Sequence, residues 1–175
     1  YVINNINMVS VYPDVNYSSL KKSISSYCKC NENNIVLGSG ATELISSFIN
    51  TIKPKKAVLI SPAYSEYERE LKKHNCEIIK YFSRDYNDFK IDTIELVDFI
   101  NEHESDLIII CNPNNPTGFT FSKFEMEVIL NNTKAFVMVD ETYVEFTNTK
   151  IYSSTPLVDK HDNLFVIRGT SKFFS

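Results

Sequence analysis

Short apolar runs alternate with segments of helical character along most of this chain. The runs cover residues 35–37, 57–60, 77–82, 107–111, 136–139 and 164–167. Runs of this length are typical of strands, and the least interrupted ones are typical of strands buried on both faces. Helices are expected between them, at residues 20–27, 44–49, 65–73, 93–101 and 124–130.

This alternation predicts βαβ units. We therefore expect an α/β fold with three layers, α/β/α, around a mainly parallel sheet. The 175 residues are enough for one domain with its own core, and no linker, internal repeat or low-complexity tract divides them.

An acid follows the apolar run 136–139 directly: Asp140. Ligands of open α/β sheets bind in the crevice outside the carboxyl ends of the strands, so we expect this carboxylate to face a ligand. The alternative is that Asp140 and Thr142 only cap the next segment. Complementary groups after the other strands favour the ligand-binding interpretation.

A glycine-containing turn, residues 38–40, leads into the helix expected at 44–49 and places Gly40, Ala41 and Thr42 at its start. Backbone N–H groups at such a junction bind phosphate. The turn lacks the third glycine of the dinucleotide fingerprint and the Gly-Lys of a P-loop. A simple helix cap at Ser39 or Thr42 is therefore the alternative.

Chemically useful side chains also follow the other strands: Tyr64, Asn115, Tyr143, Ser171 and Lys172. Together with Asp140 and the glycine turn, they fit a flat, phosphorylated, electron-poor heteroaromatic aldehyde. Ser171 would add a phosphate donor, and Lys172 would condense with the aldehyde as a Schiff base.

The ring of such a ligand would be held from three directions. Tyr64 would stack on its face. Asn115 and Tyr143 would donate to a ring oxygen, and Asp140 would pair with a protonated ring nitrogen and keep the ring an electron sink.

Composition narrows the class of protein. The net charge of −4 does not predict a nucleic-acid surface, and no apolar run approaches the roughly 20 residues of a membrane-spanning helix. No signal peptide opens the sequence. We interpret the four cysteines as reduced thiols of a cytoplasmic protein. The three histidines lack ligand spacing, so no metal site is expected.

Several motifs carry a resemblance to a known family, and they follow one another in its order and spacing. They are Tyr-Pro-Asp at residues 12–14, Gly-Ser-Gly-Ala-Thr-Glu at 38–43, Ser-Pro-Ala-Tyr at 61–64, Asn-Pro-Asn-Asn-Pro-Thr-Gly at 112–118, Val-Asp-Glu-Thr-Tyr at 139–143 and Thr-Ser-Lys-Phe at 170–173. The chain resembles the large domain of the class I/II (fold-type I) enzymes that depend on pyridoxal 5'-phosphate. It is most similar to the histidinol-phosphate aminotransferase group, which also holds the threonine-phosphate decarboxylases.

The resemblance implies a role for each residue named above. Lys172 would hold the cofactor and shuttle the proton of transamination. The cofactor phosphate would bind at Gly40, Ala41, Thr42 and Ser171, while the ring would be held by Tyr64, Asn115, Asp140 and Tyr143. Tyr12 matches a tyrosine that reaches the phosphate of the neighbouring subunit, which implies a homodimer. The substrates would be amino acids and 2-oxo acids.

The resemblance also implies that part of the enzyme is missing. Family members run to about twice this length and close with a smaller C-terminal domain, which carries an arginine that binds the substrate carboxylate. A second arginine usually lies shortly after the lysine. We therefore expect residues 1–175 to be a truncated cofactor-binding domain that transaminates poorly by itself.

From this resemblance we expect the chain to belong to an aminotransferase. Two alternatives stay open. One is a threonine-phosphate-type decarboxylase, which residues 65–71 and 172–174 resemble to some degree. The other is a fragment that binds no cofactor.

Overall fold

A five-stranded parallel sheet forms the centre of the computed structural model, which describes residues 3–174. Its strands are β1 (Lys56–Ser61), β2 (Glu77–Phe82), β3 (Leu107–Cys111), β4 (Phe136–Asp140) and β5 (Leu164–Ile167), in the order β2-β1-β3-β4-β5. All four pairings are parallel. The expectation of an α/β fold with a mainly parallel sheet is confirmed.

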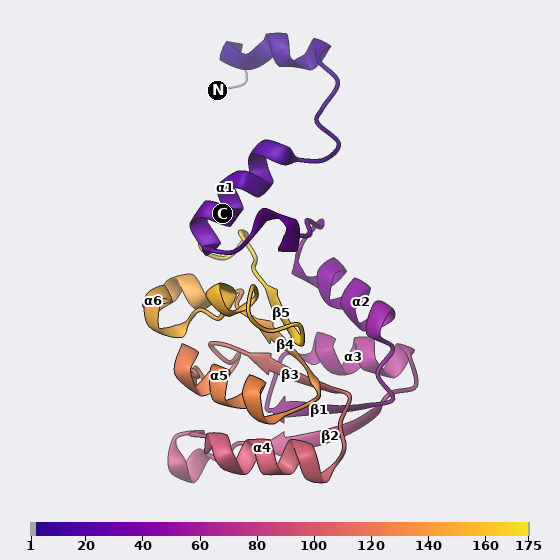
Figure 1. Ribbon diagram of the computed structural model, residues 1–175, viewed down its shortest axis with the longest axis vertical. Coiled ribbons are helices and arrows are strands. Elements are labelled where there is room, and N and C mark those ends of the chain that lie inside the picture. The colour runs from indigo at the N-terminus through magenta and orange to yellow at the C-terminus, as the bar shows by residue number, and fades with distance from the viewer. Residues whose placement is uncertain (1–2, 175) are drawn as a thin grey trace.

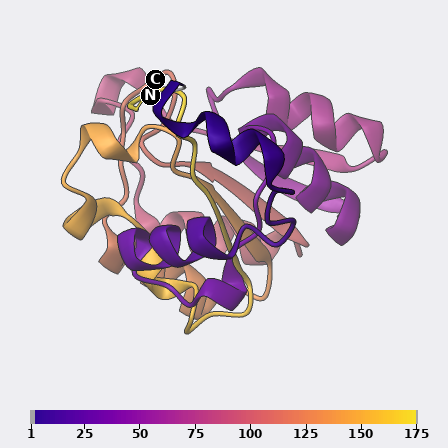
Figure 2. The same ribbon diagram turned by 90° about the horizontal axis from the view of Figure 1, so that it is seen from above.

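Helices cover both faces of the sheet, which gives the expected three layers (Figures 1 and 2). α2 (Ala41–Ile52) and α3 (Ser65–Lys73) pack on one face, and α4 (Thr93–Glu102) and α5 (Lys123–Asn132) pack on the other. The middle strand β3 is buried along its whole length and sends alternate side chains into the two cores. This double burial explains why its sequence shows no polar alternation.

The register of the strands brings their carboxyl ends to one edge. Cys111 at the end of β3 lies opposite Asp140, and Asp140 lies opposite Ile167 at the end of β5. β1 lies between β2 and β3, so the loops after β1 and β3 diverge at a point where the strand order reverses. Such a switch point is where open α/β sheets bind ligands.

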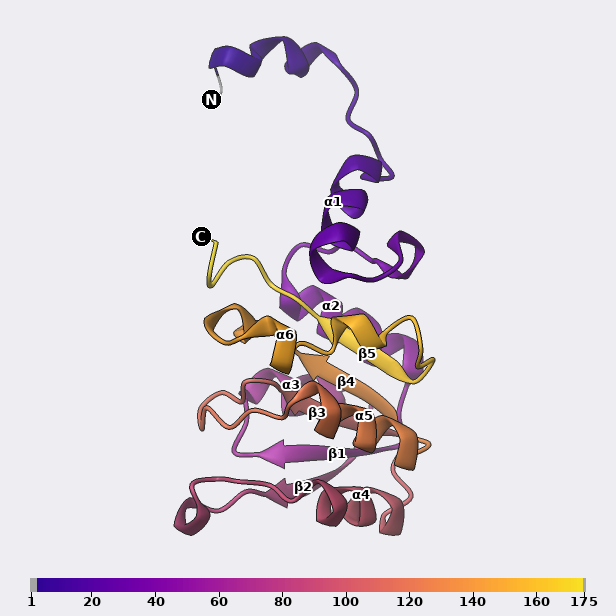
Figure 3. The same cartoon turned by 60° about the vertical axis from the view of Figure 1, so that its left-hand side comes forward.

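Smaller elements surround this framework: α1 (Ser18–Cys28), α6 (Thr149–Tyr152) and the 3-10 helices η1 (Ile3–Ser10), η2 (Glu32–Asn34), η3 (Asp85–Asn87), η4 (Val144–Phe146) and η5 (Thr155–Leu157). Residues 3–17 form an arm that stands apart from the sheet and its helices (Figure 3). The arm exposes several apolar side chains: Ile3, Ile6, Val9, Val11 and Val15.

One local prediction was wrong. Residues 35–37 pair with no described strand: they connect η2 to the glycine turn, and Val36 is 70% exposed. The sheet therefore has five strands among residues 3–174, where the sequence predicts six. At the start of α1 the N-cap residue, Tyr17, makes no side-chain cap hydrogen bond, and the Asp14 carboxylate accepts from Ser18 N at 2.7 Å.

Candidate cofactor site

Asp140 is buried at the carboxyl edge of the sheet, with 4% of its surface exposed. One carboxylate oxygen, Oδ1, accepts from the backbone N–H of Thr142 at 2.9 Å and from the Thr142 hydroxyl at 2.6 Å. The other oxygen, Oδ2, accepts from the hydroxyl of Tyr67 at 2.7 Å. Local capping by Thr142 thus accounts for one oxygen only, and the second is held by a helix on the face of the sheet.

Tyr67 connects Asp140 to other predicted site residues. Its ring lies edge-to-face against Tyr64, with centroids 5.7 Å apart. Its hydroxyl also neighbours the thiol of Cys111, whose pKa burial and the Asp140 charge raise to about 11. The backbone of Asn115 interacts with the same thiol. Tyr64, Asn115 and Asp140 are therefore grouped around one buried tyrosine and one buried cysteine.

The glycine turn has the geometry expected of an anion cradle. Gly40 has a φ of 99°, in the region that favours glycine, and it begins α2 without a side-chain cap. The first-turn N–H groups of α2 are thus left available. Gly40 and Ala41 line a cavity of about 950 Å³, and Ser171 lines the same cavity from the far end of the chain. Three of the four residues predicted to bind phosphate thus line one cavity, whereas Thr42, Asp140, Tyr64 and Lys172 do not line it.

Lys172 lies in a turn closed by a hydrogen bond from Phe174 N to Thr170 O, 3.0 Å long. Its side chain is exposed. Phe173 packs edge-on against Phe146, with centroids 5.2 Å apart, and Phe146 contacts Tyr143. The lysine segment is thus joined to the loop that follows β4, the strand that ends at Asp140.

Tyr12 is not brought to this site within one chain. It is 85% exposed and belongs to the arm that stands apart from the sheet.

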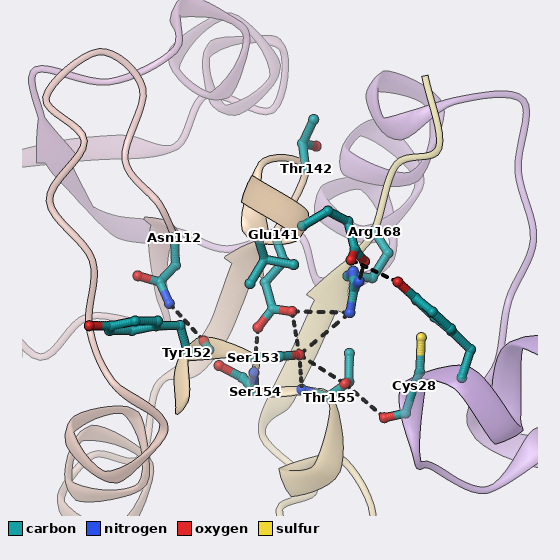
Figure 4. Close-up of polar contacts among 12 residues, drawn as sticks. Cys28, Asn112, Glu141, Thr142, Tyr152, Ser153, Ser154, Thr155 and Arg168 are labelled. Atoms are coloured by element: carbon teal, nitrogen blue, oxygen red, sulfur yellow. Dashed lines mark hydrogen bonds and ion pairs between the residues drawn. The ribbon is translucent and has the colours of Figure 1, made fainter. Parts of the chain in front are cut away.

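A second polar cluster lies beside the site, and the sequence did not reveal it (Figure 4). Its centre is Glu141, which is almost completely buried. The Glu141 carboxylate accepts from the backbone N–H of Ser154 and from the Ser153 hydroxyl, and it lies 3.5 Å from an Arg168 nitrogen. Arg168 also pairs with Glu145. Burial raises the pKa of Glu141, against the opposing effects of its hydrogen bonds and Arg168.

This cluster connects the ends of β4 and β5 with α1. Tyr27 of α1 donates to Glu145 at 2.7 Å, which raises the pKa of the tyrosine, and its ring lies 5.9 Å from the Arg168 guanidinium. Because Arg168 precedes Lys172 by four positions, the cluster fixes the start of the lysine segment. Arg168 is already paired with two carboxylates, which makes it unsuited to binding a substrate carboxylate.

Replacing Arg168 by methionine is expected to destabilise the protein by about 3 kcal/mol, because it leaves the Glu141 carboxylate buried without its cation. The measurement is the free energy of unfolding in denaturant. Arg69→Met is the matched control, since Arg69 pairs with Glu66 and Glu70 but its side chain is 58% exposed. The control should lose less than about 1 kcal/mol. Equal losses in the two variants would contradict a structural role for the buried pair.

Three findings bear on the other expectations. No helix within residues 3–174 is long and apolar enough to cross a membrane. In the same part of the chain, no group of three or more His, Cys, Asp or Glu side chains could hold a metal ion. All four cysteines are free thiols.

Comparison with known proteins decides the family. The model of the family described as "Aminotransferase class I and II" matches residues 3–175. This chain belongs to the class I and II aminotransferase family. The resemblance predicted from the sequence is therefore confirmed, and so is the fold class.

The relatives that are similar to this chain carry the names of two different activities. A protein of Caldanaerobacter subterraneus subsp. tengcongensis, provisionally named threonine-phosphate decarboxylase, is 38% identical over 95% of this chain and 46% of its own length. The crystal structure of histidinol-phosphate aminotransferase from Clostridium acetobutylicum is 35% identical, with a TM-score of 0.82 over 98% of this chain and 52% of that one. The chain thus spans about half the length of these relatives.

Enzymes of the class I and II aminotransferase family depend on pyridoxal phosphate. One solved structure with the same fold, at a TM-score of 0.81 and 18% identity, is histidinol-phosphate aminotransferase from Sinorhizobium meliloti in complex with this cofactor. The described residues fit the group: a buried carboxylate with acceptor capacity left, a helix N-terminus without a side-chain cap, and a lysine after the neighbouring strand.

Proposed function

We propose that the whole protein containing this chain is a pyridoxal-phosphate-dependent aminotransferase. It would transfer an amino group between an amino acid, or an amine like histidinol phosphate, and a 2-oxo acid. The observation that carries the proposal is the Asp140 carboxylate, buried at the carboxyl edge of a parallel sheet and held on both oxygens by hydrogen bonds. The family match and the 35% identical aminotransferase structure support the choice of transfer.

Each residue would act on a different part of the cofactor. When bound, pyridoxal phosphate supplies an aldehyde and an electron-withdrawing ring. Lys172 would hold the cofactor covalently through its amine, and as a free amine it would carry a proton to or from the substrate carbon. Asp140 would keep the ring nitrogen protonated as its counter-charge, and Tyr64 would exclude water from one ring face.

The remaining proposed contacts orient the cofactor. Gly40, Ala41 and Thr42 offer backbone N–H groups at the start of α2, and Ser171 lines the same cavity as Gly40 and Ala41. Asn115 and Tyr143 donate to the ring oxygen from the loops after β3 and β4.

A decarboxylase is the second candidate, because the 38% identical relative carries that name. The products separate the two. Incubation of the whole purified protein with amino acid, phosphorylated amine or O-phosphothreonine is expected to give an oxo product that depends on added 2-oxo acid. Release of carbon dioxide without a 2-oxo acid would instead establish decarboxylation. Neither product from any of these substrates would contradict both.

The assembly and domain structure are also proposals. We propose that residues 1–175 form the cofactor-binding domain, that a smaller domain outside them completes the substrate site, and that the isolated chain transaminates poorly. The coverage of about half of each relative supports this division. We further propose a cytoplasmic homodimer in which Tyr12 reaches the cofactor phosphate of the partner, supported by the exposed tyrosine on a projecting arm.

A further inference from the structure

Among residues 3–174, the hydroxyl of Tyr67 is the one donor to the Asp140 carboxylate that comes from a distant part of the chain, 73 residues away. Tyr67 lies on α3, at the centre of the core on that face, with 1% of its surface exposed. None of the roles proposed above uses this residue.

The pattern of hydrogen bonds shows which carboxylate oxygen is open to a ligand. A carboxylate has about four lone-pair positions, two on each oxygen. Among residues 3–174, Thr142 fills both positions of Oδ1, and Tyr67 fills one position of Oδ2. The position that remains is on Oδ2, the oxygen that Tyr67 holds.

Tyr67 is suited to be a permanent donor. Burial and the neighbouring Asp140 charge both raise the pKa of its phenol, so it stays protonated at physiological pH. Its ring is fixed edge-to-face by Tyr64, with an interplanar angle of 85°. A fixed donor of this kind orients the carboxylate plane and withdraws charge from Oδ2.

We propose that Tyr67 is a positioning residue that orients Asp140 and lowers its basicity, so that the proton stays on the cofactor ring nitrogen. This inference rests on the proposed function, in which Asp140 pairs with that nitrogen. Tyr67 itself would not touch the substrate or the reacting atoms.

The test compares Tyr67→Phe with wild type in the whole protein, with pyridoxal phosphate as the probe. Loss of the hydroxyl is expected to raise the dissociation constant of the cofactor about 5- to 10-fold, as for one lost hydrogen bond. The pH midpoint of the visible absorption band is expected to rise, since a more basic Asp140 draws the proton from the ring and makes the lysine–cofactor linkage more basic. The fold decrease in turnover should be larger than the fold change in the substrate KM.

Tyr81→Phe is the matched control. Tyr81 is also a buried tyrosine with a raised pKa, about 12, but it lies on β2 in the opposite core. The Tyr81→Phe variant should have a cofactor dissociation constant within about twofold of the wild-type value and an unchanged pH midpoint of the absorption band. If Tyr67→Phe behaves like Tyr81→Phe in both measurements, the inference is wrong while the cofactor site stands.

Two further measurements keep the test decisive. In an Asp140→Asn background, Tyr67→Phe should cause little additional loss of cofactor affinity, because the two residues act as one unit. Additive losses would overturn the inference.

A fluorinated tyrosine at position 67 keeps the shape of the side chain and donates more strongly, so the pH midpoint of the absorption band should fall. An unchanged or higher midpoint would overturn the inference, even if Tyr67→Phe does not fold. Absence of cofactor binding by wild type would instead contradict the proposed function.

Discussion

Lys172→Ala is expected to abolish covalent attachment of pyridoxal phosphate in the whole protein and to lower turnover about a thousandfold or more. Lys172 follows β5, which pairs with the strand that ends at Asp140, and no other described strand of the sheet ends in a lysine segment of this kind. The measurement is borohydride reduction followed by peptide mass analysis, which should locate the reduced cofactor on residue 172 in wild type and nowhere in the variant.

Lys160→Ala is the control for this experiment. Lys160 is an exposed lysine in the loop before β5 and lies outside the proposed site. Its replacement should leave the visible band, the trapped peptide and turnover unchanged. A trapped cofactor on Lys172→Ala, or an equal loss of the band in both variants, would contradict the role proposed for Lys172.

Asp140→Asn is expected to weaken cofactor binding about 10- to 100-fold, because it removes a charged partner of the ring nitrogen. Turnover should fall by about a hundredfold or more, since the ring then loses its preorganised counter-charge. The fold should persist, because asparagine keeps the size of the side chain and can still accept from Thr142. Cofactor titration and turnover, each measured with circular dichroism as a check of folding, test this expectation.

Asp106→Asn is the control, because it replaces a hydrogen-bonded aspartate that lies outside the proposed cofactor site. Asp106 accepts from the backbone N–H groups of Lys55 and Lys56, just before β3, at the opposite edge of the sheet. It should change stability without changing cofactor affinity. If the two asparagine variants bind pyridoxal phosphate equally well, Asp140 does not pair with the ring.

The sheet could be predicted because its strands are short and buried. The runs at 77–82, 107–111 and 164–167 are strands with those bounds. The prediction is wrong at residues 35–37, where three apolar residues indicate a strand that does not form. Strand formation needs a neighbouring backbone to pair with, and an apolar run by itself does not show that one is present.

The site was predictable where its residues follow strands, and less so where contacts join distant segments. Tyr27 and Glu145 are 118 positions apart, and Tyr67 and Asp140 are 73 apart. The hydrophobic periodicity of the sequence does not predict contacts between residues so far apart. Tyr67 did leave one signal: it stands four positions before Leu71 in an otherwise charged helix, and both are buried. That spacing marks the buried stripe of α3.

Asp140 and Glu141 are consecutive acids with separate partners: the first contacts Tyr67 on α3, and the second contacts Ser153, Ser154 and Arg168. Successive side chains at a strand end leave the backbone in opposite directions. Deleting a single codon just before this pair would therefore bring the glutamate to the position of Asp140. A glutamate, longer by one methylene, would then project toward Tyr67. A change of length at this point is therefore expected to disturb the site even when it preserves the overall acidity.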